Sequence, residues 1–424
     1  MLRRVATILF VVIAEATRVF LPVVLACVRR RHGERDRLLG TMVTAAVTRL
    51  GPCFVKLAQM FSYRTDLLSE QFVGPLAGLQ DEVAYANRQD DIEKCMREFK
   101  QCHPEMSLDS EEPIGAGSVA IVFRARLASG QVVAVKVVRE WVGCAIEMDS
   151  ALVRVFVHWL ARIPSLRSVP LVLMFDEVAA LVSRQVDMIF EGEMLDRFLA
   201  LKSPKDFVHT PRRITNVPLH RRILVMEWIG ERRSLRAAGM SQKSFQFAAD
   251  NLLKRLYRMI FVDGLVHCDL HPGNVLYRGD EGLTLVDLGL ATLLTEKDRL
   301  NFRGFFSAFV LNDSNKCAEA MLQGAISRPE KVNHPVLLKD VAGLLSVHHG
   351  LRAGEFFVAR FVFDVFELQR MHRLYAAPGF IAAIWALVMY EGLVRDLYPD
   401  LDFQSAARPY VVSHWISKAK VLNR

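Results

Sequence analysis

The segment from residue 267 to residue 289 constrains the fold of this chain more than any other part of its sequence. It begins with the polar run His267-Cys268-Asp269-Leu270-His271-Pro272-Gly273-Asn274 and ends with Asp287-Leu288-Gly289. Residues 275–277 and 283–286 between these runs are apolar and β-prone, and a polar, glycine-containing stretch at 279–282 separates them. This pattern predicts a β-hairpin that brings Asn274 and Asp287 to the same end.

Asp269, Asn274 and Asp287 have the residue types and spacing of a phosphoryl-transfer site. An aspartate five residues before an asparagine can place a carboxylate beside the acceptor group and an amide oxygen on a metal ion, and the later aspartate supplies a second metal ligand. Mg²⁺ prefers such oxygen ligands and also binds phosphate oxygens. The segment therefore predicts binding of ATP and Mg²⁺, with Asn274 and Asp287 as metal ligands and Asp269 orienting the attacking hydroxyl or water.

The two histidines of this segment do not indicate a metal site. A zinc peptidase has a glutamate directly after the first histidine of its His-x-x-x-His motif, and Cys268 stands there in this chain. We expect His267 to brace the catalytic loop by hydrogen bonding.

A glycine-containing turn, Gly115-Ala116-Gly117-Ser118, fits both a dinucleotide-binding fingerprint and a kinase phosphate loop. A dinucleotide fingerprint must open a helix, whereas the β-prone runs 121–123 and 132–135 flank Ser129-Gly130, which predicts a hairpin with a two-residue turn. We therefore expect Gly115, Ala116, Gly117 and Ser118 to cover nucleotide phosphates.

Lys136 ends the second strand of this hairpin, where strand alternation points it away from its valine neighbours. It is a candidate to neutralise the α- and β-phosphates, and such a lysine needs an acidic partner on a helix. Glu191 is the candidate partner, one helical turn after Asp187, although a solvated acidic face is the alternative for Glu191. Residues 225–229 are predicted to form a further strand. Its backbone at Glu227 and Ile229 could recognise adenine, or it could be a plain core strand.

Composition excludes some classes of protein. The 424 residues carry a formal net charge of +8, but the excess is dispersed and no basic motif with interleaved aromatics appears, so we expect no nucleic-acid partner. Seven cysteines form no C-x-x-C pair, which indicates neither a zinc site nor a disulfide framework.

The first thirty residues contain two apolar stretches, 5–14 and 19–28, flanked by arginines. Glu15 and Arg18 interrupt them, and each charge would cost roughly 2.5–3.5 kcal/mol in the centre of a bilayer. Three readings stay open: a helix packed on the protein's own surface, a helix lying on or shallowly inserted in a membrane surface, and a membrane span.

The pattern changes along the chain predict an α+β fold. We expect an apolar, basic membrane-associating helix at 1–36, a helical extension at 37–110, a β-containing lobe at 111–230 and a helical lobe at 231–424.

These features together resemble the UbiB family of atypical protein-kinase-like proteins, also called aarF-domain-containing kinases. The most specific likeness is Gly51-Pro52-Cys53-Phe54-Val55-Lys56-Leu57-Ala58-Gln59, which is similar to the family's K-x-G-Q extension, while Asp187 and Glu191 are similar to its E-x-D motif and following glutamate. The resemblance implies a protein-kinase-like bilobal fold with a helical N-terminal extension. It also implies that Lys56 and Gln59, with Asp187, regulate access to the site.

The resemblance further implies an ATPase or atypical kinase in isoprenoid-quinone (ubiquinone) metabolism. The protein would then lie at the cytoplasmic side of a membrane, as a peripheral or N-terminally anchored protein. Its partners would be lipids or quinone-biosynthesis enzymes. The chain departs from the family pattern where Ala58, Gln185, Met194 and Leu288 replace the usual Gly, Glu, Asn and Phe. The oligomeric state stays open.

Two other functions are compatible with the residues. Small-molecule phosphotransferases of the aminoglycoside or choline kinase type use a similar H-x-D-x-H-P-G-N run, but they lack a counterpart of Lys56 and Gln59. A nucleotide-binding scaffold without turnover is the other alternative, and the intact Asp269, Asn274 and Asp287 argue against it.

Overall fold

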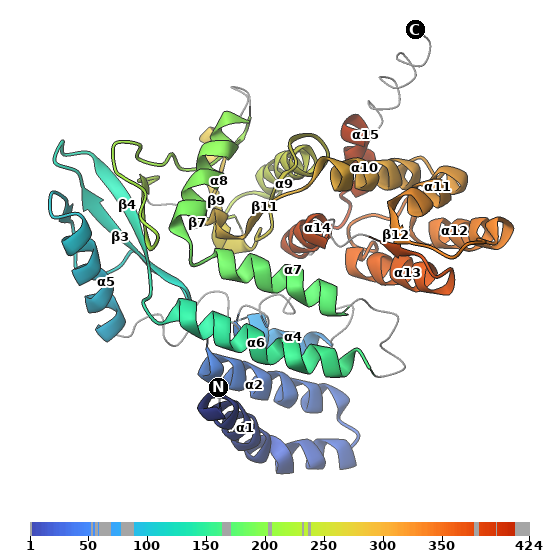
Figure 1. The fold of residues 1–424 in the computed structure, drawn as a ribbon, viewed down its shortest axis with the longest axis horizontal. Coiled ribbons are helices and arrows are strands. Elements are labelled where there is room, and N and C mark those ends of the chain that lie inside the picture. The colour runs from blue at the N-terminus through green and yellow to red at the C-terminus, as the bar shows by residue number, and fades with distance from the viewer. Residues whose placement is uncertain are drawn as a thin grey trace, which may run out of the picture. The chain divides into compact units, whose positions relative to one another are not determined.

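The computed structural model describes residues 2–51, 54–55, 58, 69–77, 89–162, 171–201, 206–230, 233–235, 239–376, 381–395 and 397–411. The chain divides into two compact units (Figure 1). The sheet unit comprises Met1–Phe156, Val178–Leu199 and Pro211–Glu231, and the helical unit comprises Val157–Glu177, Ala200–Thr210 and Arg232–Arg424. The α+β class is confirmed, while the functional division at residues 36, 110 and 230 stays a prediction.

Five strands form the antiparallel sheet of the sheet unit, in the order β1-β3-β4-β6 with β2 paired to β3. The strands are β1 (Ser107–Leu108), β2 (Gly115–Ala116), β3 (Ala120–Arg126), β4 (Val132–Val138) and β6 (Ile223–Glu227).

The turn between β3 and β4 is one residue longer than predicted. Leu127 donates its N–H to the carbonyl of Gln131 at 3.0 Å and accepts from the N–H of Gly130 at 2.8 Å, so residues 128–130 form the loop. Gly130 has a φ of +86°, a left-handed conformation that costs glycine little and is typical of three-residue hairpin loops. The predicted two-residue turn was therefore wrong.

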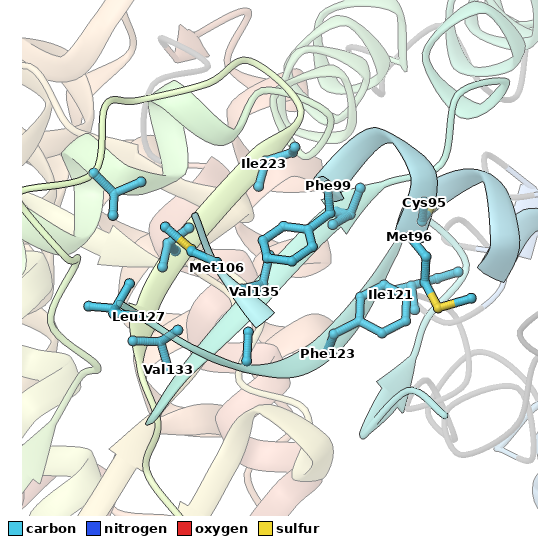
Figure 2. Packing of buried hydrophobic residues seen from close by; sticks show 14 of the residues in the cluster. Cys95, Met96, Phe99, Met106, Ile121, Phe123, Leu127, Val133, Val135 and Ile223 are labelled. Carbon is cyan, nitrogen blue, oxygen red and sulfur yellow. The ribbon is translucent and has the colours of Figure 1, made fainter. Parts of the chain in front are cut away.

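Alternating side chains of β3 and β4 point to one face of the sheet, where α5 (Gln89–Cys102) covers them (Figure 2). A fully buried apolar side chain contributes about 1.5–3 kcal/mol relative to an exposed one, so this cluster stabilises the sheet unit. The fully buried members of the cluster are Phe99, Ile121, Phe123, Ala125, Val133, Val135 and Val137.

Among the described residues, six further helices lie in or cross into the sheet unit, and tight packing sets the approach of two of them. Gly40 of α2 packs against α4, where a Cβ atom would lie 2.2 Å from the carbonyl oxygen of Phe72. The helices are α1 (Leu2–Val28), α2 (His32–Leu50), α4 (Glu70–Ala77), α6 (Val142–Leu160), α7 (Leu171–Arg184) and α8 (Met188–Ala200).

Charged residues hold α1 against α2 and α6 along one narrow strip. Glu15 is 5% exposed and accepts from Arg49 of α2 at 2.7 Å, and Arg4 pairs with the buried Asp149 of α6 at 2.6 Å. Most of the remaining helix surface is apolar and exposed, as at Phe10 and Phe20. Within the described part of the chain, α1 is the one helix whose length and composition would allow it to cross a membrane.

The helical unit is built mainly from α9 (Gln242–Arg258), α10 (Glu296–Val310), α11 (Ser314–Gly324), α12 (His334–His348), α13 (Val358–Met371), α14 (Ile381–Val394) and α15 (Phe403–Val411). Buried tyrosine hydroxyls join helices distant in sequence: Tyr257 donates to the carbonyl of Phe403 at 2.6 Å, and Tyr390 donates to that of Ala249 at 2.7 Å. These bonds anchor the C-terminal helices to α9.

Short strands complete the helical unit. One sheet has the order β5-β10-β9-β7, and two strand pairs, β11-β8 and β12-β13, stand apart from it. The strands are β5 (Val208–His209), β7 (Arg233–Ser234), β8 (Leu265–His267), β9 (Val275–Tyr277), β10 (Leu283–Leu285), β11 (Ala291–Leu293), β12 (Ala325–Ser327) and β13 (Tyr375–Ala376).

Candidate functional site

Some of the predicted site residues lie in the sheet unit and the others lie in the helical unit. In the sheet unit, the glycine-containing turn joins β2 to β3, so it opens a strand and the dinucleotide-binding alternative is excluded. Gly117 donates its N–H to the carbonyl of Ala120 at 2.9 Å and thereby closes the turn. A Cβ atom on Gly115 would meet no other heavy atom within 4 Å, and neither Gly115 nor Gly117 has a positive φ. The backbone conformation therefore requires neither glycine, and Gly115 leaves open space above the turn.

Arg139 braces this turn, although no sequence motif predicts it. The residue is 1% exposed, and its guanidinium donates to the carbonyl of Gly117 at 3.1 and 3.2 Å. The same group pairs with Asp91 of α5 at 2.9 Å, and Trp141 donates to that carboxylate at 3.1 Å. A single arginine after a strand and a distant aspartate give no recognisable motif, so only the fold brings them together.

Lys136 and Glu191 form the buried ion pair that the sequence predicts. The Nζ atom lies 2.9 and 2.8 Å from the two carboxylate oxygens of Glu191, whose residue is 1% exposed. Lys136 projects from β4 on the face opposite Val135 and Val137, as strand alternation requires.

Asp187 does not lie inside a helix as expected but precedes one, α8, and caps it. Its carboxylate accepts from the backbone N–H groups of Ile189 and Phe190 at 3.0 and 3.3 Å, so it caps the first turn of α8. The prediction that Asp187 and Glu191 share a helical face is wrong, because α8 begins after Asp187. The cap fixes the start of the helix that carries Glu191.

Glu227 ends β6, the edge strand beside β4, and Ile229 follows it. The backbone N–H of Glu227 donates to the carbonyl of Arg212 at 2.7 Å, and its carboxylate accepts from the N–H of Arg212 at 3.2 Å. The strand is thus held on both sides, and its proposed contact with adenine stays a prediction.

In the helical unit, His267 organises the loop that carries Asp269. Its Nδ1 accepts from the backbone N–H of Asp269 at 3.1 Å, and its Nε2 lies 3.1 Å from the carbonyl of Val286. These two bonds require a neutral ring with the proton on Nε2. Burial lowers the pKa of His267 and favours that neutral form. The expectation that His267 braces the loop is confirmed.

Asn274 and Asp269 lie in direct contact at the end of this loop. The amide nitrogen of Asn274 donates to the carbonyl of Asp269 at 3.0 Å and to its carboxylate at 3.2 Å. Both side chains are buried, with 5% and 3% exposure. Because the amide hydrogens are used in this way, the amide oxygen is the atom of Asn274 that could bind a cation.

The predicted hairpin of β9 and β10 is present and places Asp287 next to this loop. The strands pair in antiparallel register, and Val286 donates its N–H to the carbonyl of Asn274 at 3.0 Å. Asp287 itself has a φ of +59°, in the left-handed region that non-glycine residues rarely adopt. Its carboxylate accepts weakly from Gly289 at 3.4 Å.

The donor set fits Mg²⁺ and does not fit zinc. No group of three or more His, Cys, Asp or Glu side chains that could hold a metal occurs among the described residues. The available protein ligands are hard oxygens of Asn274 and Asp287, and Mg²⁺ is commonly bound by one or two such groups together with water and phosphate oxygens.

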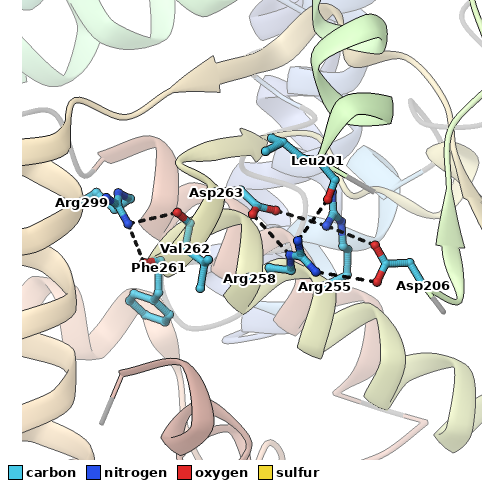
Figure 3. Close-up of polar contacts among 8 residues, drawn as sticks. All are labelled: Leu201, Asp206, Arg255, Arg258, Phe261, Val262, Asp263 and Arg299. Atoms are coloured by element: carbon cyan, nitrogen blue, oxygen red, sulfur yellow. Dashed lines mark hydrogen bonds and ion pairs between the residues drawn. The ribbon is translucent and has the colours of Figure 1, made fainter. Parts of the chain in front are cut away.

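A short π-helix, Met259–Asp263, supports the strand that leads into this loop (Figure 3). The buried Arg255 pairs with Asp263 at 3.2 Å, and Arg299 donates to the carbonyls of Phe261 and Val262 in the π-helix at 3.1 and 3.0 Å. Gly264 ends the π-helix with a φ of +71°. This arrangement, which the sequence did not reveal, fixes the position of β8.

Two of the predicted regulatory residues, Lys56 and Gln59, lie outside the described residues. Of the positions that depart from the family pattern, Ala58 packs with Leu76, and Met194 is 1% exposed in α8. Gln185 is also buried.

Comparisons with known proteins agree on one relationship. A sequence model of the ABC1 atypical kinase-like domain matches residues 78–321, more than half of the chain. The uncharacterized protein slr0889 of Synechocystis sp. is 28% identical over 346 residues, which cover 78% of this chain and 84% of that protein. Proteins named probable protein kinase UbiB, from Klebsiella pneumoniae and Tolumonas auensis, are each 26% identical. Those matches cover 91% and 92% of this chain and 72% of each relative.

A solved structure is also similar to this chain. The complex of Rv3197 with erythromycin from Mycobacterium tuberculosis aligns with a TM-score of 0.49 and 16% identity, covering 84% of this chain and 91% of that one.

Proposed function

Because the chain belongs to the ABC1 atypical kinase-like family, which includes the UbiB proteins, we propose that it is an ATP- and Mg²⁺-dependent phosphotransferase or ATPase. We place its activity at the cytoplasmic side of a membrane, in support of isoprenoid-quinone (ubiquinone) metabolism, with lipids or quinone-biosynthesis enzymes as partners.

The ion pair of Lys136 with Glu191 is the observation that carries the proposal. A buried lysine and glutamate are costly to desolvate, and replacing such a pair by apolar residues often stabilises a protein. Its retention in the interior, beside an open glycine turn, is better explained by use of the lysine charge than by stability. A lysine held at both carboxylate oxygens is positioned to contact phosphate oxygens.

Each of the other site residues has its own role in the proposed mechanism. Asn274 and Asp287 would hold Mg²⁺, which supplies charge neutralisation at the phosphate oxygens. Asp269 would orient the acceptor hydroxyl or water, and its contact with Asn274 keeps its carboxylate in one position. His267 holds the backbone of this loop in place, and Arg139 does the same for the turn that would cover the phosphates.

The membrane part of the proposal rests on α1. Its exposed surface is mostly apolar, with Arg3 and Arg18 as exposed charges, and arginines 29–31 follow its C-terminal end. Apolar helices with basic flanks bind membrane surfaces that carry anionic lipids. Since Arg4 and Glu15 are used in contacts with α6 and α2, we favour a peripheral or shallowly inserted helix.

ATP hydrolysis by the full chain tests the proposal, measured with Mg²⁺ alone, with phosphatidylcholine vesicles and with vesicles that also contain phosphatidylglycerol. We expect turnover that the anionic vesicles stimulate and that Lys136→Met abolishes, while Lys94→Met, an exposed lysine on α5, leaves it unchanged. Turnover only on addition of an aminoglycoside or choline would instead assign a small-molecule kinase. Nucleotide binding without turnover under every condition would indicate a scaffold.

A further inference from the structure

An apolar cavity of about 80 Å³ lies inside the helical unit, apart from every residue assigned above to ATP chemistry. One face of α10 and one face of α13 form most of its wall, and α9, α11, α14 and α15 contribute the rest. Aromatic side chains dominate the lining, among them Phe302, Phe305, Phe306, Phe361 and Phe366. One water molecule needs roughly 10–15 Å³ on this measure, so the cavity exceeds an ordinary packing gap.

Gln369 is the residue that distinguishes this cavity from a gap between apolar helices. It follows Val365 and Phe366 on the lining face of α13, where every other lining residue of that helix is apolar. Gln369 is 7% exposed, and its side-chain amide makes no hydrogen bond within the described part of the chain. Asn301 of α10, which also lines the cavity, likewise has no side-chain hydrogen bond among the described residues.

A polar amide on this wall needs a hydrogen-bond partner. Neither amide atom of Gln369 is among the described buried polar atoms that lack a partner, so the amide faces the open volume of the cavity and is not sealed in a packed interior. A methionine or leucine would fill the same space without turning a polar group toward phenylalanine rings. Water in the cavity finds few polar groups, because a well-held water makes two to four hydrogen bonds and the wall is mostly apolar. A ligand with a hydrogen-bonding group would supply the partner that the wall lacks.

We propose that this cavity is a binding site for a small neutral molecule with one aromatic ring and one hydrogen-bonding substituent. Aromatic rings prefer edge-to-face and offset contacts with other rings, which the phenylalanine walls offer from two helices. The substituent pairs with the amide of Gln369. An anionic ligand is disfavoured, because Asp298 lines the same cavity and the apolar remainder of the wall would not replace the lost hydration.

Two isosteric probes, 4-fluoroaniline and 4-fluorotoluene, test the site by ¹⁹F NMR titration of the full chain. They share one ring and differ only in the hydrogen-bonding substituent. We expect saturable binding of both, with a dissociation constant for 4-fluoroaniline lower by about fivefold, which corresponds to one net hydrogen bond.

Substitutions locate the binding. Gln369→Met keeps the length of the side chain and removes the amide, so it should equalise the two dissociation constants. The matched control, Gln323→Met at an exposed glutamine of α11, should leave their ratio unchanged. Gly324→Ala should weaken both probes by reducing the cavity, and its added Cβ would lie 3.9 Å from the nearest neighbour, Asn301, so the fold should tolerate it.

Several results would overturn the proposal. These are absence of saturable binding, equal binding of the two probes to the unsubstituted chain, or a ratio that Gln369→Met leaves unchanged. Equal binding would assign the cavity to a plain hydrocarbon ligand. Thermal unfolding of each variant verifies that a loss of binding does not come from a loss of fold.

Discussion

His267 donates a hydrogen bond from Nε2 to the carbonyl of Val286, at 3.1 Å, and Val286 is the residue before Asp287. The other ring nitrogen accepts the backbone N–H of Asp269. One neutral imidazole therefore ties together the two backbone segments that carry the candidate catalytic and metal-binding carboxylates. The position of both carboxylates depends on the protonation state of a residue that contacts neither phosphate nor metal in our proposal.

Stability should fall on acidification partly because of His267. Burial lowers the pKa of His267 in the folded state below the value of about 6.5 that it has when unfolded. The unfolded state then binds the proton more readily, so this contribution is complete above about pH 6.5 and is lost as the pH falls from there toward the lowered pKa. His267→Gln should show a smaller loss of unfolding free energy between pH 7.5 and 5.5 in urea titrations. His334→Gln, at an exposed position, should keep the full pH dependence, and identical curves for all three proteins would refute this role.

The ion pair in β4 and α8 should show strong coupling. Lys136→Met leaves the buried carboxylate of Glu191 without its partner, which should lower the free energy of unfolding by about 3–5 kcal/mol. The double variant Lys136→Met with Glu191→Met should recover most of that loss, because no uncompensated charge remains. Urea unfolding followed by circular dichroism measures the cycle. Additive losses in the double variant would mean that the pair is not coupled.

Asp287→Asn should separate metal binding from folding. Asparagine tolerates the left-handed conformation at φ +59° and can still accept from Gly289, so the melting temperature without ligand should change little. It loses the charge that would hold Mg²⁺, so the stabilisation by ATP that depends on Mg²⁺ should disappear in a thermal-shift assay. A variant that ATP and Mg²⁺ stabilise as strongly as the unsubstituted chain would remove Asp287 from the metal site.

Two glycines in helices should respond in opposite directions to alanine. Gly40→Ala places a methyl group 2.2 Å from the carbonyl oxygen of Phe72, and the forced separation of α2 and α4 should cost about 1–3 kcal/mol. Gly343→Ala, in α12 with nothing within 4 Å of its Cβ, should stabilise the chain by about 0.5–1 kcal/mol. Denaturant midpoints of the two variants test the pair, and the same sign of change at both sites would contradict the packing described here.

Exposed aromatic residues of α1 should control attachment to vesicles. Phe10 and Phe20 are 66% and 67% exposed, and replacing both by serine should weaken binding to vesicles with anionic lipid by at least about tenfold, since each buried aromatic ring contributes about 1.5–3 kcal/mol. Co-sedimentation measures the change. Phe363→Ser, at another exposed phenylalanine, should sediment with vesicles like the unsubstituted chain. Unchanged binding of the double variant would exclude α1 as the attachment site.

Local signals account for what could be predicted from the sequence. The β9–β10 hairpin follows from two apolar runs around a glycine-rich stretch, and the orientation of Lys136 follows from strand alternation. The pairing of Lys136 with Glu191 needed the further expectation that a phosphate-binding lysine is held by a helical acid. Each of these inferences depends on a local sequence pattern that limits where the side chain can point.

The supporting contacts could not be predicted in the same way. Arg139 reaches Gly117 and Asp91 only because β4 and α5 pack together, and the π-helix before β8 depends on Arg255 and Asp263, which are ordinary helix-surface residues by sequence. The capping role of Asp187 was missed because its spacing from Glu191 also fits a continuous helix. Tertiary packing decides all three.

The sheet unit takes its residues from three separate stretches of the chain, and this has a consequence for synthesis on the ribosome. Its edge strand β6 and the helix that carries Glu191 are made after the first part of the helical unit. The nascent chain therefore cannot complete its first unit until residue 231 has emerged, and Lys136 must wait without its partner while residues 157–177 pass. A single cut in the gene after residue 231 would keep the sheet unit on one fragment but would leave residues 157–177 and 200–210 of the helical unit with it, so no single cut gives both units whole and the two have to be translated together.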